Sequence, residues 1–197
     1  MVLRVRLSAK RHDTLISAYA PTMSYPYEAK EFFYEKLADA TRAVPRNDKL
    51  ILLGKFNARV GRDSSAWPGV LVGHGIGKDN ANGTLLLTLC TEHQHVITNT
   101  VFQQADKGKT TWMHQRSGHW HLIDYVIVRR SDQSDVKLTR AMRGATMWSD
   151  HRLVRCKLQL SIKPLRGLKR EAPPRKFSVS SLKSETIQQQ LEEHTQQ

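Results

Sequence analysis

Three apolar segments of this 197-residue sequence end in, or enclose, polar side chains that packing alone would not place there. The first is the run Leu-Ile-Leu-Leu at 50–53, which is followed at once by Gly54-Lys55-Phe56-Asn57. The second, at 122–128, encloses Asp124, and the third begins directly after Asp150-His151. Because open α/β sheets commonly assemble their sites at strand ends, these side chains are candidates for binding or catalysis.

Asp124 and the Asp150-His151 pair point to phosphate or metal chemistry. An unpaired carboxylate is costly to bury, so Asp124 needs a partner, and a histidine or a metal ion would serve. Neighbouring side chains of an extended segment alternate in direction, so Asp150 and His151 can offer one group to a metal ion and one to a phosphate. Taken singly, each group also has a structural interpretation: Lys55 and Asn57 as turn residues, Asp124 as the partner of a structural arginine, and Asp150 as a turn cap.

The elements that position these groups follow from the spacing of apolar residues. Alternation or continuous apolar runs predict strands at 3–7, 14–19, 50–53, 96–98, 122–128, 136–138 and 154–160. Helical spacing predicts a helix over 28–44 and a second one capped by Asn82, with a glycine-rich surface loop at 61–77. Strands and helices do not alternate regularly, so we expect a mixed α/β (α+β) sandwich rather than a doubly wound sheet.

The formal net charge of +13 indicates a polyanionic partner, and DNA or RNA is the usual one. Part of this charge lies in residues 163–177, which we interpret as a basic, proline-containing linker between a globular region at 1–162 and a polar, helical tail at 178–197. No apolar run is long enough to span a bilayer, and no signal peptide is apparent, so we expect no membrane partner. Two cysteines do not make a disulfide scaffold, which suits an intracellular compartment; the nucleus is one of several that fit.

Four motifs occur in a fixed order along the chain: Tyr19-Ala20-Pro21, Gly54-Lys55-Phe56-Asn57, Ile123-Asp124-Tyr125 and Ser149-Asp150-His151. Together they resemble the endonuclease/exonuclease/phosphatase superfamily, whose members include abasic-site nucleases and DNase I-like enzymes. The stretches at 67–71, 74–78, 97–100 and 119–125 resemble more specifically the endonuclease domain of RTE/BovB-type non-LTR retrotransposons. The resemblance extends to about residue 162 and implies part of a four-layer α/β sandwich of the DNase I-like type.

The resemblance implies Mg²⁺-dependent hydrolysis of DNA phosphodiesters and assigns a role to each matching residue. Tyr19 would position the phosphate and Asn57 would hydrogen-bond to it. Asp124 would orient His151, which would stabilise the pentacovalent phosphate, and Asp150 would supply a carboxylate to the metal. We expect three further side chains to contact nucleic acid or to pack near the site: Trp112, His119 and Trp120.

Two departures from the family pattern predict an inactive copy. Lys55 stands where the family has an aspartate that orients the attacking water, and a charged lysine neither accepts a proton nor ligates Mg²⁺. The family's metal-binding glutamate, with an asparagine near it, lies on strands upstream of the position that matches Met1. We therefore expect missing N-terminal strands, an incomplete metal site around Asp150, marginal stability, and an exposed sheet edge open to a protein partner.

Three alternatives to a crippled endonuclease remain open at this stage. The chain could be a remnant that binds DNA or RNA through its basic surface, a protein-interaction module that uses the exposed edge, or a decayed copy without a selected function. A zinc site is not expected, because neither Cys90, His93 and His95 nor His114, His119 and His121 have the spacing of a four-ligand structural site.

Overall fold

The computed structural model of the chain describes residues 1–8, 11–144 and 149–160. Its strands and α-helices are, in chain order, β1 (Val2–Arg6), β2 (His12–Tyr19), α1 (Tyr27–Arg42), β3 (Lys49–Lys55), β4 (Val60–Gly61), β5 (Ile76–Asp79), α2 (Ala81–Glu92), β6 (His95–Ile97), β7 (Trp112–Met113), β8 (Trp120–His121), β9 (Asp124–Arg129), β10 (Val136–Met142) and β11 (Leu153–Leu158). Short 3-10 helices lie between these elements at Thr98–Thr100, Asp106–Gly108 and Arg130–Asp135.

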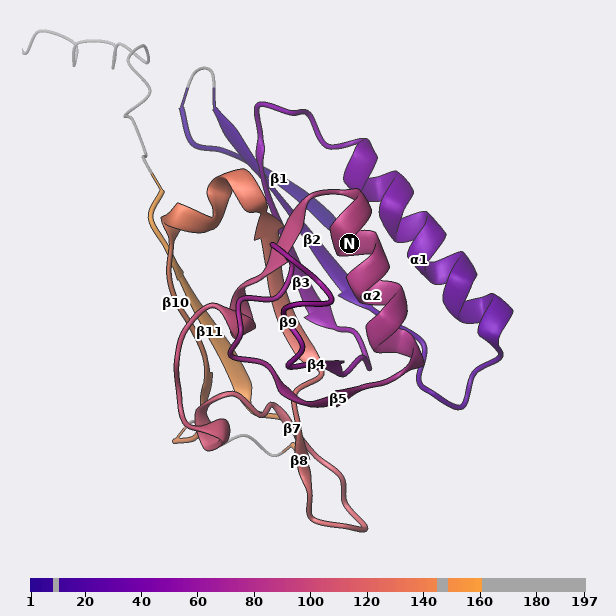
Figure 1. The fold of residues 1–197 in the computed structure, drawn as a ribbon. Helices are drawn as coiled ribbons and strands as arrows, with labels where there is room; N and C mark the ends of the chain where they lie inside the picture. Colours follow the sequence, from indigo (N-terminus) through magenta and orange to yellow (C-terminus); the bar gives the residue numbers. More distant parts are fainter. Residues whose placement is uncertain (9–10, 145–148, 161–197) are drawn as a thin grey trace, which may run out of the picture. The chain divides into compact units, whose positions relative to one another are not determined.

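A five-stranded sheet in the order β1-β2-β3-β9-β6 forms the centre of the fold (Figure 1). β2 and β3 are parallel, and the other neighbouring pairs are antiparallel. The central position of β3 explains its sequence, because a strand that is covered on both faces needs apolar residues on both. Leu50 and Leu52 pack in the core on one side of the sheet, whereas Ile51 and Leu53 pack on the other.

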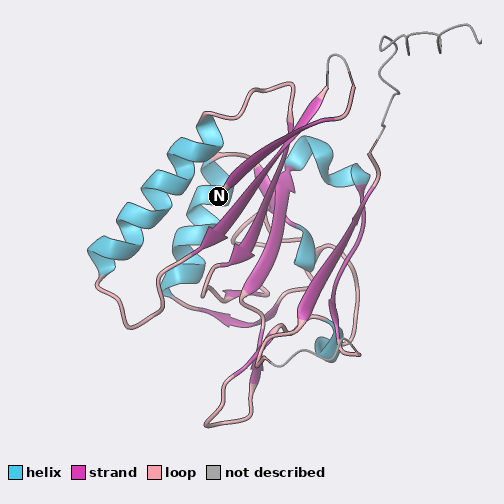
Figure 2. Ribbon diagram, turned by 180° about the vertical axis from the view of Figure 1, so that it is seen from behind, coloured by secondary structure: helices cyan, strands magenta, loops and turns pink. Residues whose placement is uncertain are grey.

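The helices α1 and α2 lie side by side on one face of this sheet, as the two opposite views show (Figures 1 and 2). Their apolar residues, among them Tyr34, Leu37 and Leu86, join Leu50 and Leu52 in the larger core cluster. At the end of the sheet opposite the predicted site, the carboxylate of Asp48 accepts hydrogen bonds from Arg4 and from the hydroxyl of Thr14.

The opposite face of the sheet is covered by an antiparallel two-stranded ribbon of β10 and β11. Val136 of β10 and three inward residues of β11, Val154, Cys156 and Leu158, pack against the smaller core cluster on the sheet. The described residues thus form three layers of mixed α/β type, which confirms the predicted fold class.

The predicted elements agree with the observed ones in type, with shifted ends. Each predicted strand and helix up to residue 160 overlaps an observed one, and β10 extends four residues beyond its predicted end. The expected half-burial of the first strand was wrong: β1 is the edge strand, belongs to neither core cluster, and leaves Val2 60% and Leu3 51% exposed.

Two further expectations are corrected by the structure. Asn80, not Asn82, caps α2, because its side chain accepts a hydrogen bond from the Gly83 backbone N–H at 2.8 Å. The segment 61–77 is not simply a surface loop, since Val70 and Leu71 are buried in the core and the short strands β4 and β5 pair at its ends.

Some predictions cannot be compared with the structure. The linker at 163–177 and the tail at 178–197 lie outside the described residues, so the domain boundaries stay a prediction.

Cys90 is buried and Cys156 half-buried, and both are free thiols. Among the residues whose structure is described, no helix has the length and apolar character needed to cross a membrane.

Gly54, at the end of β3, provides a direct test of this packing. Its φ angle is +144°, and a Cβ atom built there would lie 1.9 Å from the carbonyl oxygen of Ala18 on β2. We predict that Gly54→Ala lowers the free energy of unfolding by more than about 3 kcal/mol, measured by urea denaturation. Gly118→Ala is the matched control, because Gly118 also has a positive φ but no atom within 4 Å of its Cβ position; a similar loss in both variants would contradict the prediction.

Asp13 predicts a pH dependence of stability. Its carboxylate is 2% exposed and has no hydrogen-bond partner among the described residues, and burial raises its pKa, although Lys49 and Arg11 act in the opposite direction. A raised folded-state pKa means that stability is present below the unfolded pKa and is lost as pH rises through the folded one. Asp13→Asn should therefore stabilise the protein by about 1 kcal/mol at pH 7 and leave it unchanged near pH 3. A variant less stable than the parent at pH 7 would contradict this.

Candidate active site

Three of the predicted site residues lie side by side across the sheet. The strand register pairs Tyr19 of β2 with Lys55 of β3, and Lys55 with Asp124 of β9. Residues paired in this way point to the same face, and here this is the face that carries Ile51 and Leu53. One row of polar groups therefore ends the apolar surface between the sheet and the ribbon.

Asp124 has the histidine partner that its apolar surroundings require. Its Oδ2 lies 3.0 Å from Nδ1 of His151, which comes from the segment just before β11. Both side chains are largely buried, at 17% and 23% exposure. Because Nδ1 is used by Asp124, Nε2 is the ring nitrogen that remains for a ligand.

Backbone contacts hold this pair in place from two sides. Asn99 accepts from the Val126 N–H through its side-chain oxygen and donates to the carbonyl of Asp124. The hydroxyl of Thr111 accepts from the backbone N–H of Asp124. Sequence reasoning missed Asn99 and Thr111 as supporting residues, although the position of Asn99 within the segment 97–100 was a usable signal.

Asp150 is oriented by the indole of Trp112, whose Nε1 donates to Oδ2 over 2.7 Å. This hydrogen bond is the main reason that the pKa of Asp150 is lowered, with the nearby His151 adding to it. The backbones also meet: Met113 donates to the carbonyl of Asp150, and Trp112 pairs with His151 in an isolated β-bridge. The Asp150-His151 segment is thus attached to β7.

Asn57 lies beside this row in a left-handed conformation, with φ of +49°. Its Nδ2 donates to the carbonyl oxygen of Ala20 at 2.7 Å, so the side chain connects the ends of two of the motifs. Asn82, at the start of α2, is fully buried and donates to the carbonyls of Pro21 and Asn57. The sequence did not indicate this role for Asn82, because it was interpreted as the helix cap.

Two cavities meet at Lys55. The larger, of about 750 Å³, extends between the sheet and the ribbon, and the polar residues that line it are Tyr19, Lys55, Asp124, Asp150, His151 and Arg152. The smaller, of about 460 Å³, is lined by polar or aromatic groups that include Lys55, Asn57, Arg59, Trp112, His114 and His121. The structure therefore brings together all five predicted catalytic residues and Trp112 around the altered position.

The ammonium group of Lys55 lies over the ring of Tyr19, with Nζ 5.3 Å from the ring centroid. This is a cation–π contact. Within the described residues, no group of three or more His, Cys, Asp or Glu side chains is arranged to hold a metal ion. Of the two carboxylates at the site, Asp124 is paired with His151 and Asp150 accepts a hydrogen bond from Trp112. This donor set, with a lysine beside it, does not match the oxygen-rich shell that Mg²⁺ requires.

The other two predicted nucleic-acid contacts lie on the β7–β8 hairpin. His119 is exposed, and Trp120 is half-buried beneath the guanidinium of Arg152, which lies 3.4 Å from the ring centroid. Neither lines the two cavities. Their role in binding stays a prediction, and Arg152, which follows His151 directly, is an additional basic residue at the rim that sequence reasoning did not single out.

The α/β sandwich is the fold that the four ordered motifs predicted. At the ends of its strands lie an Asp-His pair, a tyrosine, an asparagine and an aspartate that accepts a hydrogen bond from a tryptophan. The chain has the fold of the endonuclease/exonuclease/phosphatase superfamily. It is 35% identical over 164 residues to craniofacial development protein 2 from Bos taurus, and 35% identical over 151 residues to the protein of the same name from Tragulus javanicus. These matches cover 82% and 76% of this chain but only 27% and 26% of the relatives, so the chain spans about a quarter of their length. No family model matches the chain.

Solved structures agree on the fold. The endonuclease domain of TRAS1, a telomere-specific non-LTR retrotransposon, superposes with a TM-score of 0.57 at 21% identity. The match covers 81% of this chain and 63% of the TRAS1 domain chain. The 3′ phosphatase NExo from Neisseria, bound to a product DNA hairpin, gives 0.54 at 19% identity over 75% and 62%. The catalytic domain of APE2 from Xenopus laevis gives 0.53 at 19% over 81% and 55%.

The indole of Trp112 makes a measurable prediction about Asp150. Trp112→Phe removes the Nε1 donor while keeping an aromatic ring, so we expect the pKa of Asp150 to rise toward its ordinary value. The measurement is a pH titration of the Asp150 carboxyl carbon by NMR. Trp120→Phe is the control, because Trp120 contacts Arg152 instead. An unchanged titration of Asp150 in Trp112→Phe would show that the indole does not stabilise the carboxylate.

Proposed function

We propose that this chain is a nucleic-acid-binding domain with the architecture of a phosphodiesterase, derived from a retrotransposon endonuclease, in which Lys55 suppresses hydrolysis. The observation that carries the proposal is the row Tyr19-Lys55-Asp124. An ammonium group occupies the centre of this row, between two residues that match the family motifs. A lysine at this point attracts a phosphate and opposes a metal ion, so binding and turnover are affected in opposite directions.

The side chains around the larger cavity suit a phosphodiester. Lys55 supplies a positive charge, Tyr19 is 67% exposed and presents its hydroxyl, and His151 presents Nε2 because Nδ1 is paired with Asp124. Asp124 balances any charge that His151 acquires beside a phosphate. In this proposal the pair orients and stabilises a bound phosphate group, as the resemblance implied.

The proposal takes DNA as the preferred ligand, with RNA as the alternative. Three observations support nucleic acid: the net charge of +13, the fold shared with a structure of NExo bound to a DNA hairpin, and the fold shared with the endonuclease domain of TRAS1. In an active member of the family, Mg²⁺ would act as a Lewis acid on the phosphate. The donor set around Asp150 does not fit this ion, so no step is assigned to it here.

The decisive test is the nicking of supercoiled plasmid in Mg²⁺ by the purified chain, with Lys55→Asp beside it. We expect the unmodified chain not to nick, because the lysine cannot orient an attacking water or tolerate a metal ion. Nicking by Lys55→Asp alone, abolished by EDTA and by the additional change His151→Ala, would identify Lys55 as the inactivating change.

Nicking by the unmodified chain that is lost in His151→Ala and in EDTA would overturn the proposal, because turnover would then tolerate Lys55. If neither protein nicks but both bind DNA, Lys55 is not the sole obstacle and the binding role remains. Binding should weaken steeply with salt and should not require a divalent metal.

A second candidate function, recruitment of a protein partner, is favoured by the exposed edge of the sheet. Among the described residues, β1 pairs with β2 alone, and it exposes Val2, Leu3 and Val5. An edge of this kind can pair with a strand of another chain. A stable stoichiometric complex that is lost when Leu3 is changed to lysine would support this candidate.

A further inference from the structure

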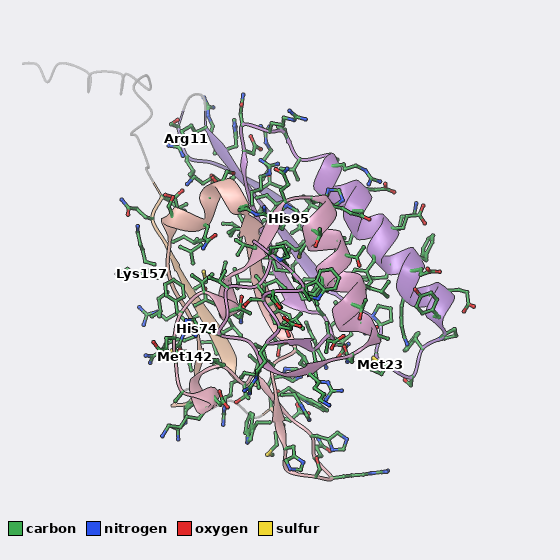
Figure 3. All side chains as sticks on the ribbon, viewed as in Figure 1. Arg11, Met23, His74, His95, Met142 and Lys157 are labelled. Atoms are coloured by element: carbon green, nitrogen blue, oxygen red, sulfur yellow. The ribbon has the colours of Figure 1, made fainter. Side chains whose placement is uncertain are left out.

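The ribbon of β10 and β11 has an inner and an outer face of very different character. Thr139 and Cys156 are paired across the ribbon and point inward, where their side chains are in contact. The next pair, Arg140 and Arg155, therefore points outward, and so does Lys157, two residues further along β11. Figure 3 shows Lys157 on the side of β11 that faces away from the helices.

This outer face is basic and contains no acidic residue. Four of its side chains are cationic and exposed: Lys137, Arg140, Arg155 and Lys157. We call these four residues the outer ribbon face. The outward pairs also include the apolar residues Leu138, Met142 and Leu153, of which Leu153 is 50% exposed. The sequences of the two strands, Val-Lys-Leu-Thr-Arg-Ala-Met and Leu-Val-Arg-Cys-Lys-Leu, have no aspartate or glutamate that could balance them.

The central pair is unfavourable for the folded chain by itself. Arg140 and Arg155 lie directly opposite each other, and like charges in that position destabilise a sheet by roughly 0.2–1 kcal/mol. Among the described residues, five Lys or Arg side chains form ion pairs with carboxylates, including Arg4 with Asp48 and Lys49 with Asp135. Among the described residues, none of the four cations of the outer ribbon face forms an ion pair. The arrangement is explained if an external anion neutralises it.

The outer ribbon face is continuous with the rim of the active site. β11 begins two residues after His151, and Arg152 between them lines the larger cavity. The positive charge of Arg143, just beyond the end of β10, acts on Arg152 and contributes to lowering its pKa, after burial. Basic side chains thus lead from the site end of the ribbon along its outer surface.

We propose that the outer ribbon face binds the sugar-phosphate backbone of a nucleic acid whose neighbouring segment lies at the Tyr19-Lys55-Asp124-His151 site. The choice of a nucleic acid as the polyanion rests on the proposed function. Charge complementarity favours a phosphate backbone over an apolar partner, because the four exposed cations have no acidic residue in either strand to balance them. Contacts of this kind position the ligand without reading its sequence.

The test is equilibrium binding of a DNA duplex, and of an RNA duplex of the same sequence, over a range of salt concentrations in EDTA. Each lost phosphate contact lowers the salt dependence of log K by about 0.9 for B-DNA. We expect Arg140→Ala/Arg155→Ala to lower this slope by about 2 and to weaken binding about tenfold at physiological salt. Arg140→Lys/Arg155→Lys should retain most of the slope, because the charges remain.

The matched control is Lys36→Ala/Arg46→Ala, which removes two exposed cations at and just beyond α1, on the opposite side of the sheet. It should leave the slope unchanged. Equal effects of the two double variants would overturn the proposal, since net charge alone would then explain them. The double alanine variant of the ribbon should also unfold at no lower temperature than the control, which separates lost contacts from lost folding.

A Lys55→Ala variant keeps this inference distinct from the proposed function. If Lys55→Ala weakens binding and the ribbon variant does not, the ribbon proposal fails and the proposed function stands. If only the ribbon variant weakens binding, the ribbon proposal stands and phosphate binding at Lys55 is contradicted. If the parent chain binds neither duplex at low salt, both are overturned.

Discussion

Strand β3 is covered on both of its faces, and most of the structure follows from that constraint. It needs apolar residues facing the helices and apolar residues facing the ribbon, which leaves room for polar groups only at its end. The close approach of β2 at Gly54 then fixes the register in which Tyr19, Lys55 and Asp124 stand in one row. A slip of β3 by one residue would turn Lys55 toward the helices and away from Tyr19 and Asp124, so the packing of the strand and the geometry of the site are a single requirement.

In the proposed function, the site binds a phosphodiester without hydrolysing it. The pair of Asp124 and His151, together with the indole that orients Asp150, retains the groups that would surround a phosphate. Lys55 alters the electrostatics at the centre of the same row without disturbing the fold, because its aliphatic stem continues the apolar face and its ammonium group rests on Tyr19. In the proposed function, this one side chain changes what the site attracts.

Much of this arrangement could be predicted from the sequence, because the strongest signals were short and local. The apolar run at 50–53 and the enclosed Asp124 located the site, and the structure supplied the histidine partner that its burial required. The side chains that support the site through hydrogen bonds from distant parts of the sequence could not be predicted in the same way. Asn82 and Thr111 act through hydrogen bonds to backbone groups distant in the sequence, and no periodicity marks such contacts. The resemblance led us to expect an exposed sheet edge, but the alternation in β1 wrongly indicated half-burial, because alternation indicates a strand and does not say what covers it.

The hairpin of β7 and β8 is joined to the segment that bears Asp150 and His151 through its backbone as well as through Trp112. Met113 donates to the carbonyl of Asp150, and Arg152 donates to the carbonyl of Thr111. The position of His151 relative to Asp124 therefore depends on the hairpin as well as on the central sheet.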